Sequence, residues 1–266
     1  MELYFGTGGY SNDDWLGLLY PEGTRSNKYL EIYAQYYNAV ELNSSFYAIP
    51  GIRAFEGMVK KSKARVRFAV KAHQSITHTR DADDDTYQRL LESVEPLRAA
   101  GMLGPFLLQF PYSFHRTADN RRYLKSVVDR LAGERLALEF RHQSWDNDEV
   151  RQACRDLGVA FVSVDYPPLT GLPSSGLYLT GDTAYLRLHG RNREKWWDGK
   201  DASERHDYRY TPEELRPWVE SILARQDDLS QLYLFMQNTT KGHALYNLRM
   251  LKELFNERGL EVAIGW

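Results

Sequence analysis

The sequence contains a single cysteine, Cys154, in a chain of 266 residues. One cysteine cannot form an internal disulfide, and this one lies in the helix-like segment 150–157, so we interpret it as a packing residue. The sequence also lacks an apolar run of the ~18 residues needed to span a bilayer. Its opening residues, MELYFGTGGY, have neither a basic leader nor a long apolar region. We therefore expect a soluble, cytoplasmic protein with no membrane partner.

An excess of basic residues is missing as well. Lys and Arg total 34 against 36 Asp and Glu, which gives a formal net charge of -2. Proteins that bind a phosphate backbone usually carry a basic excess or stripe, so composition leaves nucleic acid unsupported as a partner without excluding it. Hydrophobic residues make up 42% of the chain. That fraction is sufficient for the core of one large domain, and we predict a single domain over residues 1–266.

No Pro/Ser-rich linker or low-complexity segment interrupts the chain. Apolar or β-branched runs alternate with amphipathic stretches of helical length from one end to the other. Eight strands in repeating strand–helix order predict an α/β fold of the TIM (β/α)₈ barrel type, with a doubly wound open sheet as the alternative. The predicted strands are 3–7, 39–47, 65–72, 105–110, 136–142, 159–165, 184–190 and 232–238. The predicted helices are 26–37, 52–63, 83–100, 119–132, 147–157, 212–226 and 243–257.

Helix boundaries carry their own signals. Ser26 is a candidate cap for the first helix, and Thr211 is one for the helix that starts at Pro212, with Glu213 and Glu214 near the positive end of its dipole. The segment 166–183, YPPLTGLPSSGLYLTGDT, is too rich in proline and glycine for a regular helix. We expect one of the eight barrel helices to be missing or reduced after the sixth strand.

The stretch AYLRLHGR, residues 184–191, alternates in an unusual way. Leu186 and Leu188 share one face of the predicted strand, while Tyr185, Arg187 and His189 share the other. If leucine and β-branched residues face the surrounding helices in every strand, polar residues point into the barrel near the carboxyl ends of the strands, where barrel enzymes build their sites. The inward-pointing candidates are Glu41, Asn43, Lys71, Gln109, Glu139, Arg141, Asp165, Arg187, His189 and Asn238.

Such a concentration of buried charge indicates a site, because an unpaired buried charge costs several kcal/mol. A static ion-pair network at the barrel mouth is the alternative explanation. In the functional interpretation, Arg187, Arg141 and Lys71 bind and neutralise an anion. Glu139 or Asp165 acts as general base and His189 transfers a proton. Lys71 as a Schiff-base nucleophile is a variant.

Metal-binding signatures are weak. The sequence has no HExxH, no CxxC and no H-x-H pair at a strand end. Glu41, Glu139, Asp165 and His189 could still form a divalent-metal site assembled from several strands. Because Lys71, Arg141 and Arg187 bring three positive charges into the same volume, we predict an anion site and no cofactor, with a divalent metal as the alternative.

Loops supply further candidates. The segment 191–210 is long, charged and aromatic, and we expect it to cover the barrel mouth as a lid, with Arg191, Trp196, Trp197 and Tyr208 available to a ligand. His78 follows the third strand, and its position fits loop hydrogen bonding and substrate contact equally well. His142 is predicted to cap or pack on the outer face. His73, His115, His206 and His243 are interpreted as surface or loop residues.

Several motifs together resemble one known family. GTGGYSNDDWLGLLYP, VELNSSFY, FAVKAHQSITH, LLQFPYSF, EFRHQSW, YLRLHGR and NTTKGHALYN occur in order over almost the whole chain. They are similar to the family called domain of unknown function 72 (DUF72), or YecE-like. The resemblance implies a TIM barrel but no reaction. It carries over the positions Glu41, Asn43, Tyr47, Lys71, His78, Gln109, Glu139, Arg141, Trp145, Asp165, Arg187, His189 and Arg191.

The eighth segment departs from that family pattern at two positions. Where the family usually has Phe-Asn-Asn, this chain has Met236, Gln237 and Asn238. Gln237 keeps an amide, so the departure affects only the reach of the side chain.

Three functions follow as hypotheses. The first is an enzyme that acts on a small anionic substrate, phosphorylated or carboxylated and sugar-like, by acid/base chemistry; hydrolysis, isomerisation and elimination all fit. The second is a divalent-metal-dependent phosphodiesterase or endonuclease. The third is a non-catalytic protein that binds a metabolite or nucleic acid. The oligomeric state is left open.

Overall fold

The computed structural model describes residues 1–199 and 202–264. Its sheet contains only parallel pairs, in the order β6-β5-β4-β3-β2-β1-β9-β8-β7. The two ends of this order, β6 and β7, are successive pieces of one strand separated by Val162, so the sheet closes on itself. The predicted barrel is confirmed and the open doubly wound sheet is wrong. The strands are β1 (Glu2–Thr7), β2 (Ala39–Leu42), β3 (Arg67–Lys71), β4 (Leu103–Phe110), β5 (Leu136–Phe140), β6 (Ala160–Phe161), β7 (Ser163–Asp165), β8 (Thr183–Leu188) and β9 (Gln231–Met236).

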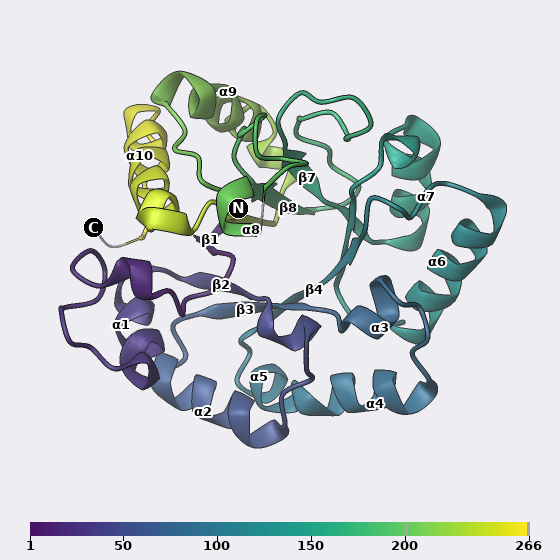
Figure 1. Cartoon of the computed structure of the whole chain (residues 1–266), viewed down its shortest axis with the longest axis horizontal. Helices are drawn as coiled ribbons and strands as arrows, with labels where there is room; N and C mark the ends of the chain where they lie inside the picture. The colour runs from purple at the N-terminus through teal and green to yellow at the C-terminus, as the bar shows by residue number, and fades with distance from the viewer. Residues whose placement is uncertain (200–201, 265–266) are drawn as a thin grey trace.

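Helices surround the strands, as Figure 1 shows. The predicted helix 83–100 is divided into α4 and α5, and two short helices, α3 and α8, were not predicted. Among the described residues, none of the helices combines the length and apolar composition needed to cross a bilayer. The helices are α1 (Tyr29–Tyr36), α2 (Ile52–Ser62), α3 (Gln74–Thr77), α4 (Asp84–Ser93), α5 (Glu95–Ala99), α6 (Ala118–Arg130), α7 (Asp148–Leu157), α8 (Ala202–Arg205), α9 (Pro212–Leu223) and α10 (His243–Glu257).

The two predicted helix starts have different outcomes. At α9, Thr211 is the N-cap residue and Pro212 occupies the first turn, as the sequence predicts; in addition, the backbone N–H of Thr211 donates to Glu214 Oε2 at 3.0 Å. The cap assigned to Ser26 is wrong. Ser26 instead begins a short 3₁₀ turn, Ser26–Lys28, that leads into α1, and neither segment has a side-chain cap.

The segment between β7 and β8 contains no helix over residues 166–182, all of which the structure describes. It runs back along the sixth strand instead. Thr180 Oγ1 accepts from the backbone N–H of Phe161 at 2.9 Å, and Ser163 Oγ accepts from that of Tyr178 at 2.8 Å. Side-chain oxygens of Thr180 and Ser163 thus join the segment to the sixth strand in place of a helix, and the predicted loss of one helix is confirmed.

Period-two alternation divides the strand residues into two cores. The outer core packs against the helices and includes Val40, Val70, Leu138 and Leu188. The inner core fills the barrel, and its strand residues are Tyr4, Ala39, Ala69, Leu107, Ala137, Ala160, Val162, Val164, Tyr185, Tyr233 and Phe235. The small residues of β2, β3 and β5 share this interior with the aromatic residues of β1, β8 and β9, which leaves the carboxyl ends of the strands for polar side chains.

Candidate active site

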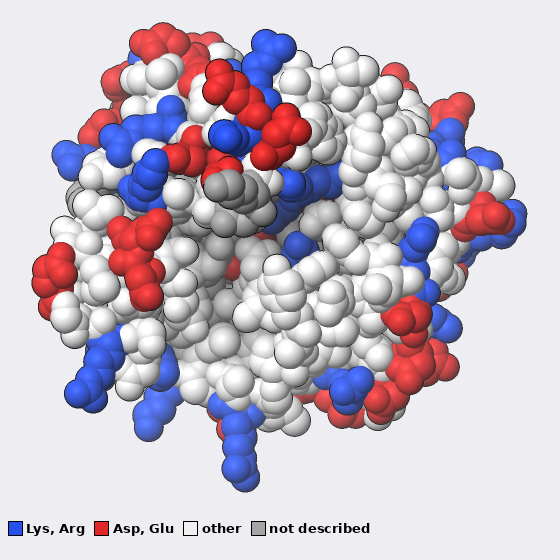
Figure 2. All heavy atoms as spheres, in the orientation of Figure 1, with Lys and Arg blue, Asp and Glu red and all other residues white. Residues whose placement is uncertain are grey.

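A cavity of about 500 Å³ opens at the carboxyl ends of the strands. Figure 2 shows Lys and Arg side chains inside the hollow on this face. Among the described residues, the charged side chains that line it are all cationic: Lys71, Arg141, Arg187 and Arg205. The other lining residues are Gly8, Asn43, Phe46, Tyr47, His78, Gln109, Pro111, Tyr112, Leu172, His189, Trp196, Trp197, His206, Gln237 and Thr239.

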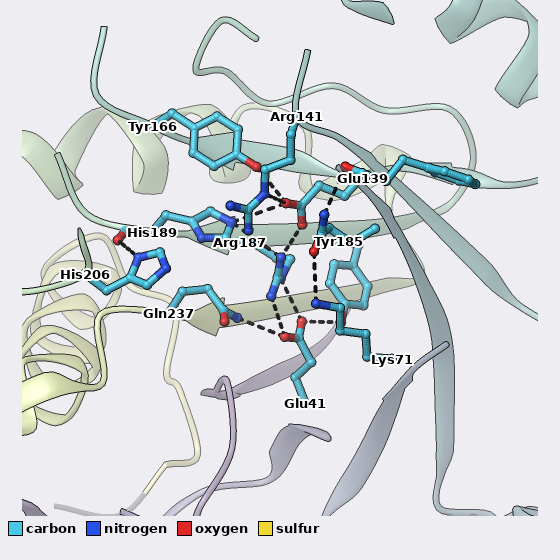
Figure 3. Close-up of polar contacts among 12 residues, drawn as sticks. Glu41, Lys71, Glu139, Arg141, Tyr166, Tyr185, Arg187, His189, His206 and Gln237 are labelled. Carbon is cyan, nitrogen blue, oxygen red and sulfur yellow. Dashed lines mark hydrogen bonds and ion pairs between the residues drawn. The ribbon is translucent and has the colours of Figure 1, made fainter. Parts of the chain in front are cut away.

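Arg187 of β8 lies at the floor of the cavity between two buried carboxylates, as Figure 3 shows. Its Nε donates to Glu41 Oε2 at 2.9 Å and its Nη2 to Glu41 Oε1 at 2.7 Å. Its Nη1 donates to Glu139 Oε2 on the other side. One guanidinium therefore joins β2, β5 and β8 across the barrel, and charge-assisted bonds of this kind are the strong ones.

The Glu41 carboxylate accepts from further donors. Tyr185 Oη donates to Oε2 at 2.7 Å and Gln237 Nε2 donates to Oε1 at 3.2 Å. With Arg187 included, each oxygen of Glu41 receives two bonds. This pattern explains how a fully buried carboxylate is tolerated at the centre of a barrel.

The Glu139 carboxylate also accepts several hydrogen bonds. Tyr166 Oη and Arg141 Nε both donate to its Oε1, at 2.6 and 3.1 Å. Burial alone would raise the pKa of Glu139, but Arg187, His189 and Arg141 together hold it well below its usual range. Glu139 is therefore a persistent anion that orients its neighbours, and it is poorly suited to accept a proton at neutral pH.

Lys71, the last residue of β3, is the cavity cation whose pKa lies near neutral pH. Its Nζ donates to Gln109 Oε1 at 2.9 Å and lies 4.2 Å from the centroid of the Phe46 ring. Burial, assisted by Arg187 and Arg141, lowers the pKa of Lys71 to about 7. At neutral pH this side chain exists both as an ammonium and as a free amine.

The two ring nitrogens of His189, the residue after β8, differ in their surroundings. Its Nε2 lies 3.6 Å from Glu139 Oε1. Its buried Nδ1 has no hydrogen-bond partner among the described residues. Burial is the main cause that holds the pKa of His189 well below 6.5, so the imidazole is neutral at pH 7. His189 thus lines the cavity with a buried ring nitrogen that lacks a partner among the described residues.

Two more histidines line the cavity. His78 makes an edge contact with Phe46, with ring centroids 4.6 Å apart, and burial lowers its pKa to about 4. His206 Nδ1 donates to the backbone carbonyl of His189 at 2.8 Å, and burial lowers its pKa to about 3. His206, interpreted from the sequence as a surface or loop residue, lies in the turn after α8 and lines the cavity, which the sequence does not predict. His142 does cap on the outer side, where its Nδ1 accepts from the backbone N–H of Ser144 at 3.2 Å.

The segment 191–210 lies over the mouth, as predicted; residues 200 and 201 lie outside the described residues. Trp196 is buried against Tyr166, with ring centroids 5.2 Å apart. Trp197 is 49% exposed at the rim and meets Tyr112 edge-on at 4.9 Å. Tyr208 lies away from the cavity lining and donates through its hydroxyl to Glu214 Oε1 at 2.5 Å.

Asp165 and Arg191 are outside the cavity. The inward orientation predicted for Asp165 is wrong, because Val162 and Val164 occupy the inner core and Asp165 faces α9. Its carboxylate accepts two bonds from Arg191, at 2.8 and 2.7 Å, and one from Trp218 Nε1 at 2.7 Å. The two predicted site residues bind each other between β7 and the helix layer.

Asn238 and Trp145 also lie elsewhere. Asn238 does not point inward as predicted; it donates to Tyr208 O at 2.7 Å and to Asn247 Oδ1 at 2.9 Å, whereas Gln237 takes the inward position. Trp145 is buried in the outer core, stacked on Phe114 and Phe140. Asn43, Gln109 and Tyr47 line the cavity, and Tyr47 is 72% exposed at its rim.

Sequence reasoning missed four residues that complete the site: Tyr166, Gln237, Arg205 and His206. Continued alternation from Val164 would have placed Tyr166 inward, and the outward Met236 would have placed Gln237 inward. Arg205 and His206 come from the covering segment, whose position over the barrel has no periodic signal in the sequence.

The four side chains of the metal hypothesis are not assembled in one place. Asp165 faces away from Glu41, Glu139 and His189, and Arg187 occupies both glutamates. Across residues 1–199 and 202–264, no group of three or more His, Cys, Asp or Glu side chains is arranged to hold a metal ion. The charged side chains that do face the cavity are cationic.

Comparison with known proteins places the chain in a family. The sequence model described as "Protein of unknown function DUF72" matches residues 4–264. The UPF0759 protein YunF of Bacillus subtilis (strain 168) is 30% identical over 270 residues, covering 96% of this chain and 95% of that protein.

Two solved structures agree. A DUF72 family protein of Thermotoga maritima superposes with a TM-score of 0.88 at 35% identity, covering 96% of this chain and 100% of the other. One from Enterococcus faecalis V583 superposes with a TM-score of 0.84 at 24% identity, covering 96% and 95%. The resemblance found in the motifs is confirmed, and this chain belongs to the DUF72 family.

Proposed function

We propose that this barrel protein is an enzyme that binds a small anionic substrate, phosphorylated or carboxylated, and moves protons on it. The observation that carries the proposal is the charge of the cavity. Four cationic side chains line it, and the two carboxylates beneath them are both bound to Arg187. A static network would balance its own charges, whereas this arrangement has cations in surplus that a bound anion would neutralise.

Arg141 and Arg205 are the groups assigned to the anion. Among the described residues, Arg141 donates to Glu139 through Nε alone, so its two Nη atoms remain for a ligand. The buried Nε of Arg205 has no partner among those residues. Guanidinium groups match the planar spacing of phosphate and carboxylate oxygens, which supports this assignment.

Lys71 and His189 are the groups assigned to proton transfer. A general acid or base works best with a pKa near the operating pH, and the pKa of Lys71 is lowered to about 7. His189 lines the same cavity, its Nδ1 lacks a partner among the described residues, and its Nε2 lies 3.6 Å from Glu139 Oε1. In this division of roles Glu139 positions the reacting groups without reacting itself, and Asp165 takes no part.

The size and rim of the cavity suit a sugar-like substrate. A volume of about 500 Å³ lies in the range of small-metabolite sites. Tyr47, Tyr112 and Trp197 expose aromatic faces around the opening, each more than a third exposed. Such faces pack against the C–H groups of a sugar ring while the anionic end reaches the cations below.

Calorimetric binding of inorganic phosphate at low ionic strength tests the anion site. Arg141→Gln is expected to weaken binding at least about tenfold, since it removes a charge-assisted pair. The matched control is Arg249→Gln, whose exposed side chain pairs with Glu253 on α10. Equal affinity of the two variants would refute the anion assignment.

Turnover decides between an enzyme and a binding protein. A panel of sugar phosphates and hydroxy acids would be incubated with the protein and followed by NMR, including solvent deuterium exchange at carbons next to carbonyl groups. Exchange or product that disappears in Lys71→Met supports catalysis. A ligand that binds tightly and is recovered unchanged, without exchange, would favour the non-catalytic alternative.

A further inference from the structure

Lys71 is the one lysine among the described cavity residues, and its surroundings differ from those of an ordinary anion-binding lysine. Its hydrogen-bond acceptor is the amide oxygen of Gln109, not a carboxylate. That amide is itself fixed, because Gln109 Nε2 donates to Phe110 O at 2.9 Å. The Nζ atom is thus held at a defined position in the wall of the cavity, with the Phe46 ring on one side.

The charged groups that face this amine come from several elements. Arg187 of β8 and Arg141 after β5 lie near enough to disfavour its protonation, and Glu139 and Glu41 oppose them more weakly. His78, in the loop after β3, is neutral at pH 7 and shares the Phe46 ring with Lys71. Binding an anion does not require a partly neutral amine, and another arginine would serve that purpose better. A neutral amine has a lone pair and is a nucleophile.

We propose that Lys71 forms an imine with the carbonyl carbon of an anionic aldehyde, ketone or 2-oxo acid bound in this cavity. The inference rests on the proposed function and names the substrate class of the same site. The carboxylate or phosphate of the substrate would lie on Arg141 and Arg205, which places a nearby carbonyl carbon beside Nζ.

The step balances without a further reactant. The Nζ lone pair attacks the carbonyl carbon, the C=O π bond opens, and a proton moves from nitrogen to oxygen to give a carbinolamine. Loss of the hydroxyl with a second nitrogen proton forms C=N and releases one water. The iminium form withdraws electrons from the adjacent carbon, which then loses a proton or a carbon substituent more readily.

Reductive trapping with glyoxylate and sodium cyanoborohydride at pH 7, followed by peptide mass mapping of the wild-type protein, tests the proposal. Lys71 is expected to be carboxymethylated at least about tenfold faster than Lys28 and Lys125, which have exposed side chains. The reason is that a pKa of about 7 leaves far more free amine at this pH than the usual lysine value does. Inorganic phosphate should protect Lys71 by competing for the arginines.

Controls separate this step from simple anion binding. Propanal, a neutral aldehyde, should label Lys71 more slowly than glyoxylate does; equal rates would overturn the anionic substrate class. Lys71→Arg replaces the amine with a guanidinium, which does not form an imine under these conditions, and should lose the label at this position. Mapping the wild-type protein keeps the test valid even if that variant folds poorly.

The outcomes also separate the two proposals. Phosphate binding without preferential labelling of Lys71 would overturn the imine and leave the anion site intact. Absence of both phosphate binding and labelling would overturn the proposed function together with the imine.

Discussion

Two clusters of charged residues lie at the same end of this barrel, and both contain an arginine bound to a buried carboxylate. The cavity cluster consists of Glu41, Glu139, Arg187, Arg141 and Lys71. Arg187 bridges the two glutamates, but the cations outnumber the carboxylates and face an open volume. In this cluster the protein leaves positive charge without a protein counterion.

The clamp cluster consists of Asp165, Arg191, Trp218, Glu214 and Tyr208. Arg191 binds Asp165 through two hydrogen bonds and reaches Glu214 at 3.4 Å, while Trp218 and Tyr208 donate to the two carboxylates. The charges are satisfied by one another and none of these residues lines the cavity. This cluster ties the start of the covering segment to β7 and α9.

The difference between the clusters is the reason for the function proposed above. Both contain bidentate Arg–carboxylate pairs, so pairing by itself does not distinguish them. The cavity cluster is distinguished by its surplus cations and by the buried Nδ1 of the adjacent His189, which lacks a partner among the described residues. A structural cluster is complete without a ligand, and a binding cluster is complete only with one.

Arg187→Met should have the largest effect on stability. It leaves Glu41 and Glu139 buried without their shared counterion, and we expect the free energy of unfolding to fall by about 3–5 kcal/mol. Urea denaturation monitored by tryptophan fluorescence measures the loss. Arg191→Met in the clamp cluster is the matched control; its arginine is 30% exposed, so water can hydrate the remaining Asp165 more easily and the loss should be smaller. A larger loss in Arg191→Met would reverse the comparison.

The pH dependence of the free energy of unfolding should reveal the cost of holding the Lys71 ammonium in the cavity cluster. The pKa of Lys71 is lowered to about 7 in the folded state from 10.5. Below pH 7 the Lys71 amine is protonated in both the folded and the unfolded state, and burial of the ammonium destabilises the folded state. Between pH 7 and 10.5 only the unfolded state holds it, so stability rises with pH.

The expected rise is about 2 kcal/mol between pH 6.5 and pH 8.5, since one pKa unit corresponds to about 1.4 kcal/mol. Urea denaturation at both pH values measures it as the difference between wild type and Lys71→Met, in which other titrating groups cancel. Identical pH profiles for the two proteins would contradict a lowered pKa at Lys71.

Glu139→Gln should strengthen anion binding. The substitution keeps the shape of the side chain and removes one negative charge close to the cations, so sulfate affinity at pH 6 should rise about threefold to tenfold. Asp165→Asn, the matched change in the clamp cluster, should leave sulfate affinity within about twofold. Calorimetry with sodium sulfate measures both affinities. Weaker sulfate binding by Glu139→Gln would contradict the view that surplus positive charge drives recognition.

The same contrast explains how much of the site the sequence could predict. In β2, β3, β5 and β8 the outward positions are Val, Leu or Phe and the inward positions near the strand ends are charged, so alternation alone predicts Glu41, Lys71, Glu139 and Arg187 inside. Arg187 and its two carboxylates meet because the carboxyl ends of parallel barrel strands converge.

The wrong and missed site residues have different physical causes. In VAFVSVD, residues 159–165, apolar side chains occupy both faces, so the pattern does not decide which way Asp165 points. For Asn238 the predicted phase is wrong: with Met236 outward, alternation puts Gln237 inward and Asn238 outward, as the structure has them. Arg205 and His206 depend on the path of a loop that is set by tertiary contacts such as that of Trp196 with Tyr166. These are non-local contacts, and a local pattern cannot encode them.

Tyr166→Phe should have the smallest effect on stability, and it tests how far the Glu139 carboxylate depends on a single donor. The variant loses one hydrogen bond to Glu139, but that carboxylate keeps Arg187 and Arg141, and the ring keeps its contacts with His189 and Trp196. We expect a loss of about 1 kcal/mol in the free energy of unfolding and unchanged sulfate affinity. Urea denaturation and calorimetry measure the two quantities, with Tyr246→Phe on the exposed surface as control. A loss as large as that of Arg187→Met would mean that the Glu139 carboxylate depends on each of its donors. The hydrogen bonds of the cavity cluster would then serve stability as those of the clamp cluster do, and its surplus of cations would no longer distinguish it as a binding site.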